Sequence, residues 1–283
     1  MPSATTRSGA AITRSEAADS LGRYGCLMLA FDEGGEGPVV LLLHGTSSSR
    51  RIWAPLREQL ASEARTIALD LPGHGESPPS SFTPPQWAAE VAAWLRDRGH
   101  GQVLVVGHSS GGWTALELAK LGRARGVLAL APAGLWLRRS PRVTNLLLGA
   151  NWGLGRVTGP LAPVLLRSRR VRALSLGAIS GRPGEVPAEL AMQSARVASA
   201  NTSFPRHFSE TKRLRFLGGR EIDVPVTVIW GERDRIALAS RSRHLDELPP
   251  HTTVETWAGC GHMLTWDAPE RVLTAARALL RAA

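Results

Sequence analysis

A serine that could act as a nucleophile lies at Ser109, with a glycine two positions before it and another two positions after it. The apolar run at residues 103–106 predicts a buried strand, and residues 113–119 predict a helix. Glycine at Gly107 and Gly111 suits a tight strand-to-helix turn, because a side chain there would collide with a neighbouring strand or helix. The spacing therefore predicts a Ser109 hydroxyl that is lifted into open space, where it can attack a substrate.

An acid and a histidine follow in the chain order that such a serine requires. Asp234 comes after the apolar run at residues 224–230, and His262 comes after the alternating run at residues 252–257. Open α/β sheets place their chemistry at the carboxyl ends of the strands, so we expect both side chains near Ser109. These three residues could form a nucleophile, base and orienting acid.

Backbone N–H groups that could bind a developing oxyanion are predicted at two positions. The N–H of Ser110 lies in the first turn of the helix after Ser109, where the helix dipole favours negative charge. The second donor is expected in the loop after the apolar strand at residues 39–43, where Gly45 allows a close backbone approach. We expect this second donor to be the N–H of Thr46.

Together, five ordered motifs resemble those of the α/β-hydrolase superfamily over residues 37–134 and 223–280; they are residues 44–47, 70–77, 107–111 and 231–234, and His262. The resemblance implies an α/β fold with a doubly wound, mostly parallel sheet, helices on both faces and an inserted helical cap. It also implies a catalytic triad of Ser109, Asp234 and His262. Glu232 is the alternative acid, but the family spacing of glycine, two residues and aspartate favours Asp234.

The predicted elements alternate as this fold class requires. Helical stretches are expected at residues 54–64, 85–98, 112–121, 240–248 and 269–281. The segment between the strand at residues 126–131 and the strand at 224 is too long for a loop. We therefore expect a mobile lead-in at residues 1–22, a core at residues 23–134 and 221–283, and a helical cap at residues 135–220.

The net charge of +10 is concentrated in the expected cap. Residues 135–220 contain 14 Arg and 1 Lys against 3 Glu and no Asp, whereas the rest of the chain is nearly neutral. Such a segment could attract an anionic membrane surface or an anionic substrate. A compositional bias toward arginine is the alternative explanation. The basic residues are not interleaved with stacking aromatics, so nucleic acid is not an expected partner.

A nearly uncharged stretch at residues 146–166 is long enough to be considered for a membrane span. Its glycines and prolines favour a pair of cap helices beside an acyl pocket instead. Trp136 and Trp152 could form walls of that pocket, or they could only seal the cap onto the core.

The histidines and the two cysteines, Cys26 and Cys260, show no metal-ligand spacing, so neither a metal nor a cofactor is expected. The first twenty residues lack the apolar segment of a secretory signal, and two cysteines are too few for a disulfide framework. A cytoplasmic location is the expectation.

The predicted reaction is cleavage of a carboxylic ester through an acyl-enzyme, with a small-molecule substrate that is an apolar acyl ester. A serine nucleophile argues against the epoxide hydrolases and haloalkane dehalogenases of the resembled superfamily, which need a carboxylate. A C–C bond hydrolase or a thioesterase could use the same triad. A protein that binds a small molecule without turnover is the alternative from another class.

Overall fold

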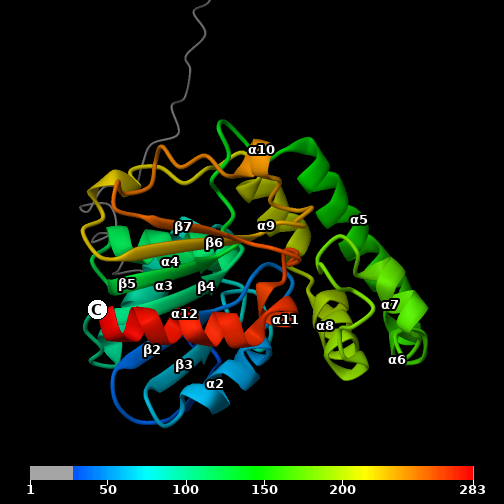
Figure 1. Ribbon diagram of the computed structural model, residues 1–283, viewed down its shortest axis with the longest axis horizontal. Helices are drawn as coiled ribbons and strands as arrows, with labels where there is room; N and C mark the ends of the chain where they lie inside the picture. Colours follow the sequence, from blue (N-terminus) through cyan, green and yellow to red (C-terminus); the bar gives the residue numbers. More distant parts are fainter. Residues whose placement is uncertain (1–27, 283) are drawn as a thin grey trace, which may run out of the picture.

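The computed structural model describes residues 28–282 and is built around one seven-stranded sheet in the order β1-β3-β2-β4-β5-β6-β7 (Figure 1). Strand β1 pairs antiparallel with β3, and every other neighbouring pair is parallel. The predicted α/β class with a mostly parallel sheet is therefore confirmed. The strands are β1 (Phe31–Gly34), β2 (Val39–Leu43), β3 (Arg65–Leu69), β4 (Val103–His108), β5 (Ala124–Leu130), β6 (Val226–Gly231) and β7 (Thr253–Trp257).

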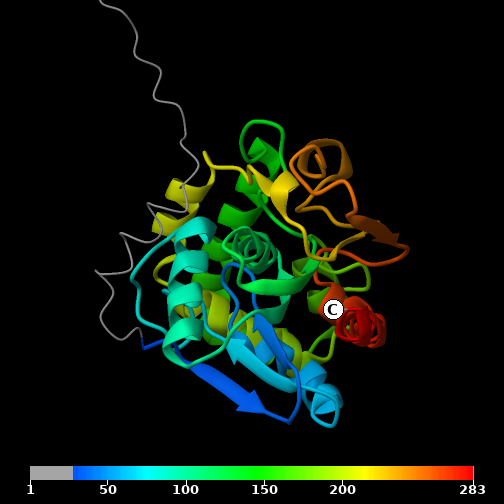
Figure 2. The same ribbon diagram turned by 90° about the vertical axis from the view of Figure 1, so that its left-hand side faces the viewer.

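Helices cover both faces of this sheet (Figure 2). Helices α2 (Ala54–Leu60) and α12 (Pro269–Ala282) pack together on one face, and α3 (Pro84–Asp97) and α4 (Ser110–Lys120) pack together on the other. The strands between them are apolar because both faces are covered; β4, for example, is buried along its whole length. This rigid centre holds the loops at the carboxyl edge of the sheet.

The helix predicted at residues 240–248 is wrong, because only α10 (Ala239–Ser242) is helical there. Arg243 ends the helix, and its guanidinium donates hydrogen bonds to the carbonyl oxygens of Gly231 and Ala237. This tertiary contact overrides the local helical tendency. Helix α2 also ends earlier than predicted, at Leu60, whose carbonyl oxygen accepts hydrogen bonds from the next turn of the chain.

Between β5 and β6 the chain forms a series of helices at one end of the sheet, coloured green to yellow in Figure 1. We refer to residues 135–220 as the cap segment. A small apolar cluster, which includes Leu166, Val186 and Met192, lies within it. Its elements are α5 (Arg142–Thr158), η3 (Gly159–Leu161), α6 (Ala162–Leu165), α7 (Arg169–Ser175), α8 (Ala188–Ala200), α9 (Phe204–Thr211) and η4 (Gly219–Glu221).

The uncharged stretch at residues 146–166 is not one helix, because α5 ends before Gly159 and Pro160. Among residues 28–282, no helix is long and apolar enough to cross a membrane. The lead-in expected at residues 1–22, and Cys26, lie outside the described residues.

Candidate active site

The turn that carries Ser109 joins β4 to α4 in a strained conformation. Ser109 has φ 54° and ψ −117°, a left-handed φ that non-glycine residues rarely adopt. A Cβ on Gly107 would lie 2.3 Å from the carbonyl oxygen of Gly111, and one on Gly111 would lie 2.3 Å from that of Leu43. Both positions therefore require glycine, because the backbones of β4, α4 and the neighbouring strand β2 approach each other closely.

The structure brings the three predicted triad side chains into one hydrogen-bonded chain. His262 Nε2 lies 3.1 Å from Ser109 Oγ, and His262 Nδ1 lies 2.8 Å from Asp234 Oδ2. Since an ionised carboxylate only accepts, Nδ1 carries the proton and Nε2 is free to accept the proton of the Ser109 hydroxyl. The arrangement can therefore activate Ser109 as a nucleophile.

Asp234 is held as an ionised carboxylate at this position. Its Oδ1 accepts hydrogen bonds from the N–H groups of Ile236 and Ala237, each at 2.8 Å. Burial alone raises the pKa of this carboxyl, but the electrostatic attraction and the hydrogen bond of the His262 Nδ1–H, together with the two backbone N–H groups, outweigh it and leave the pKa below its usual value. The alternative acid, Glu232, is exposed and accepts the N–H of Gly259, so it does not contact His262.

His108, the residue before Ser109, contacts His262. Its Nε2 donates to the carbonyl oxygen of His262 at 3.0 Å, and burial lowers its pKa to about 3. Neutral His108 therefore holds the backbone of His262 without adding a charge beside it.

The two predicted oxyanion donors lie in the loop after β2 and in the first turn of α4. Within the described residues, the N–H groups of Thr46 and Ser110 donate no hydrogen bond to protein. The side chains of these two residues contact each other, with Thr46 Oγ1 2.7 Å from Ser110 Oγ. The contact ties the loop after β2 to the first turn of α4, and so fixes the spacing of the two N–H groups.

A residue that the sequence analysis did not identify, His207 of α9, completes this contact from the cap segment. His207 Nε2 lies 2.9 Å from Thr46 Oγ1, and its Nδ1 lies 2.7 Å from the carbonyl oxygen of Phe82. Burial lowers the pKa of His207 to about 3, so the ring is neutral. A carbonyl only accepts; hence Nδ1 donates to Phe82, Nε2 accepts the Thr46 hydroxyl, and Ser110 donates to Thr46.

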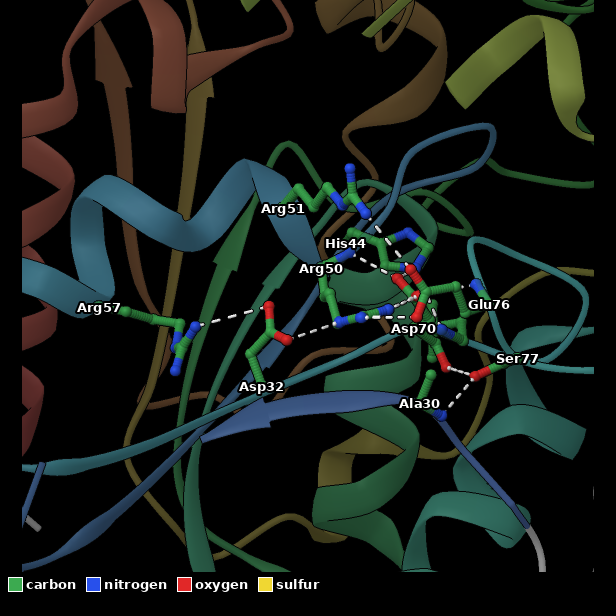
Figure 3. Close-up of polar contacts among 10 residues, drawn as sticks. Ala30, Asp32, His44, Arg50, Arg51, Arg57, Asp70, Glu76 and Ser77 are labelled. Carbon is green, nitrogen blue, oxygen red and sulfur yellow. Dashed lines mark hydrogen bonds and ion pairs between the residues drawn. The ribbon is translucent and has the colours of Figure 1, made fainter. Parts of the chain in front are cut away.

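Behind the Thr46 loop, a buried guanidinium joins three carboxylates, as Figure 3 shows. Arg50 forms ion pairs with Asp70, with Asp32 at 3.0 Å and with Glu76 at 2.9 Å. Asp70 also accepts the backbone N–H of Arg50 at 2.7 Å and that of Glu76 at 2.9 Å. The network holds the loops after β2 and β3 together and so stabilises the position of the loop that contains Thr46.

An apolar pocket opens from Ser109 into the cap segment and has a volume of about 1220 Å³, solvent at its mouth included. Trp136 and Trp152 both lie in its wall. Trp136 is also buried against Trp113 with ring centroids 5.7 Å apart, whereas Trp152 stacks on Phe204 at 5.3 Å. Among the described lining residues, Lys212 is the only Lys, Arg, Asp or Glu. The pocket can therefore accept an apolar group next to the Ser109 hydroxyl.

Within residues 28–282, no group of three or more His, Cys, Asp or Glu side chains is arranged to hold a metal ion. Cys260 is buried and unpaired, and burial raises the pKa of its thiol.

Residues 40–275 match the model of the Alpha/beta hydrolase family, which covers most of the chain. The chain belongs to the alpha/beta hydrolase family. Proteins similar to this chain catalyse different reactions on the same scaffold. Membership of the family therefore establishes the hydrolase scaffold, and the bond that is cleaved has to be inferred from the site.

Two curated relatives and one solved structure illustrate this range. The chain is 34% identical over 196 residues to an epoxide hydrolase of Mycobacterium tuberculosis, covering 65% of this chain and 89% of the relative. It is 30% identical over 258 residues to the dihydrolipoyllysine-residue acetyltransferase component of the acetoin cleaving system of Cupriavidus necator, covering 82% of this chain and 60% of that relative's length. The structure of a Rhodococcus esterase is similar with a TM-score of 0.67 and 25% identity, covering 90% of this chain and 94% of the esterase.

Proposed function

We propose that this hydrolase cleaves carboxylic esters through an acyl-enzyme formed on Ser109. The observation that carries the proposal is the continuous chain from Asp234 through His262 to Ser109, with contacts of 2.8 and 3.1 Å. In this proposal residues 23–134 and 221–283 supply the catalytic core, and residues 135–220 act as its cap.

In the first half of the reaction, Ser109 Oγ attacks the ester carbonyl while His262 Nε2 accepts the hydroxyl proton. Asp234 stabilises the resulting imidazolium. The N–H groups of Thr46 and Ser110 bind the oxyanion, and each such donor typically contributes a factor of about 10² to 10³ in rate. Collapse of the tetrahedral intermediate expels the alcohol, which takes the proton from His262.

In the second half, a water molecule attacks the acyl-enzyme carbonyl. His262 accepts a proton from that water and returns it to Ser109 Oγ when the acid is released. The same oxyanion donors serve both steps, so the site needs no rearrangement between them.

The identity of the proposed nucleophile supports an ester over an epoxide as substrate. Opening of an epoxide by a serine hydroxyl would form an ether, which has no carbonyl for water to attack and would stop the enzyme after one turnover. A carboxyl ester on Ser109 does carry such a carbonyl. The chemistry of Ser109 therefore supports an ester substrate, although one relative is an epoxide hydrolase.

The apolar pocket supports an apolar acyl group as the part of the substrate that is bound. Trp152 and Leu148 of α5 lie in the pocket wall with Phe204 of α9. The cap segment therefore shapes the part of the pocket that would hold the acyl group. Burial of each methylene contributes about 0.8 kcal/mol, which predicts a preference for chains longer than acetate.

A panel of chromogenic esters with acyl chains of increasing length tests this function directly, beside a thioester, a dienone acid for C–C cleavage and an epoxide. We expect hydrolysis of the esters, strongest for a medium chain, and its loss in Ser109→Ala. Preferential turnover of the dienone acid or thioester would replace the ester assignment. Saturable binding of esters without any turnover would make the protein a binding protein on this scaffold.

A further inference from the structure

Exposed apolar side chains are concentrated on one part of the cap segment. Of the 12 large hydrophobic residues that are exposed in the described chain, seven lie between residues 137 and 174. Three of them are more than 70% exposed, namely Leu146 at 71%, Val157 at 79% and Leu174 at 85%. The others in this group are Leu137, Leu161, Val164 and Leu165. Exposure of this kind within one segment marks an interaction surface.

The same segment carries a one-sided charge. Residues 135–184 contain nine Arg and no Asp or Glu. Eight of these arginines are exposed, and none of the nine forms an ion pair with another described residue. The exposed ones are Arg138, Arg139, Arg142, Arg156, Arg167, Arg169, Arg170 and Arg182.

Helix α5 separates this surface from the pocket. Arg142, Leu146, Ala150 and Val157 are exposed and fall within an arc of about 80° at the helical repeat of about 100° per residue. The pocket-lining residues of α5, which are Thr144, Asn145, Leu148 and Trp152, lie on the opposite side of the helix. In α7, Arg170 and Leu174 repeat the pairing of an arginine with an exposed leucine four residues later. Figure 1 shows α5 and α7 along the outer edge of the cap segment.

We propose that this outward face of α5, η3, α6 and α7, called here the outer cap face, binds the surface of an anionic lipid bilayer. Exposed leucine and valine side chains enter the region between headgroups and acyl chains, while the arginines contact the lipid phosphates. Long arginine side chains can keep their charge at the headgroups while their stems remain in apolar surroundings.

Two other occupants fit these residues less well. A symmetric dimer through this face would place the arginines of one copy against the same arginines of its partner, with no Asp or Glu between residues 135 and 184 to pair with them. A nucleic acid would attract the arginines but would leave the exposed aliphatic side chains without an apolar environment. A bilayer with anionic headgroups satisfies both the charge and the apolar side chains.

Flotation of the full chain with phosphatidylcholine vesicles, with and without 30 mol% phosphatidylglycerol, tests the proposal, at about 0.05 and 0.3 M salt. We expect binding to the anionic vesicles at low salt, and at least tenfold weaker binding to neutral vesicles or at high salt. The assay measures no turnover, so its result is independent of the proposed ester cleavage.

Two variants separate the apolar and charged contributions. Leu146→Ser/Val157→Ser and Arg167→Glu/Arg170→Glu should each weaken vesicle binding about tenfold or more. Arg241→Glu/Arg281→Glu makes the same change in net charge at exposed positions outside the cap segment and should change binding less than twofold. Thermal unfolding of each variant confirms that the fold is kept, as expected for exposed positions.

Three results would overturn the proposal. The first is equal binding to neutral and anionic vesicles, and the second is an equal loss of binding in the Arg241/Arg281 control. The third is absence of binding to the anionic vesicles at low salt. A dimer in sedimentation experiments that the Leu146/Val157 variant dissociates would then assign the face to a second copy of the chain.

Discussion

The two sides of the pocket are built in different ways. On the core side, Ser109, Asp234 and His262 follow strands of one hydrogen-bonded sheet, in which β4 and β6 are buried and β7 is an exposed edge strand. On the other side, the cap segment has a small apolar cluster of its own and exposes many of its aliphatic side chains. The sheet therefore places the side chains that we propose to react, while the cap segment lines the pocket and contacts the Thr46 loop through His207.

The largest effect is expected on the core side, at the acid of the proposed triad. Asp234→Asn should lower kcat/KM about 10⁴-fold, because an amide facing His262 favours the tautomer that cannot accept the Ser109 proton. Steady-state kinetics on an activated ester measure the loss, with circular dichroism to show that the fold is retained. Glu232→Gln is the matched control and should stay within about threefold of the unchanged protein. Similar losses in both variants would contradict the assignment of Asp234.

Stability should depend on pH through four buried histidines, which lie on both sides of the pocket. Burial lowers the pKa to about 4 for His44 and to about 3 for His74, His108 and His207. In the unfolded chain the pKa of each of these histidines is about 6.5. Below that pH the unfolded state binds more protons than the folded state, so the free energy of unfolding falls as the pH falls and recovers as it rises.

Four such groups correspond to a loss of up to about 5 kcal/mol between about pH 7.5 and 5.5. Urea unfolding at several pH values measures this slope, and His207→Gln should reduce it by about a quarter. A free energy of unfolding that stays constant over this range would show that the buried histidines are not neutral in the folded protein.

The contact between the two sides is tested at His207. His207→Phe removes the acceptor of the Thr46 hydroxyl and should lower kcat about tenfold with little change in KM, because it loosens the spacing of the oxyanion donors. Thr46→Val keeps the backbone N–H but removes the same hydrogen bond, so the double variant should be no slower than either single variant. His207→Gln, which retains an acceptor, should restore part of the rate. Additive losses, or a lower melting temperature without a change in kcat, would assign His207 a purely structural role.

The smallest effect is expected from the cap wall itself. Trp152→Ala should lower kcat/KM about fivefold for a long acyl chain and leave acetate hydrolysis nearly unchanged, because the indole belongs to the part of the pocket wall that the cap segment supplies. The exposed Leu174→Ala of the same segment should change neither. An equal loss for short and long chains in Trp152→Ala would place this side chain near the reacting carbonyl instead.

Parallel strands such as β2, β4 and β6 were predictable because their apolar runs end in glycine or histidine at the sheet edge, whereas β7 was predictable from the alternation of residues 252–257. Strand β1 was not predicted, since it has only four residues and carries Asp32 and Glu33. The helix at residues 240–248 was predicted wrongly because Arg243 makes tertiary hydrogen bonds that no local pattern reveals.

The residues of the proposed triad could be selected by chain order and strand position, and their side chains lie within hydrogen-bonding distance of one another. His207 could not be identified in this way. Its partner Thr46 is 161 residues away in the sequence, and no motif surrounds His207 in the cap segment. Its position depends on how α9 packs against the loop that contains Phe82.

Reaction with a fluorophosphonate, followed by intact-mass measurement and peptide mapping, shows whether His262 activates Ser109, because it detects an activated serine without a choice of substrate. We predict one adduct on Ser109 in the unchanged protein, none in Ser109→Ala, and a strongly slowed reaction in His262→Ala. An adduct on another residue, or equally fast labelling of Ser109 in His262→Ala, would contradict a triad in which His262 activates Ser109.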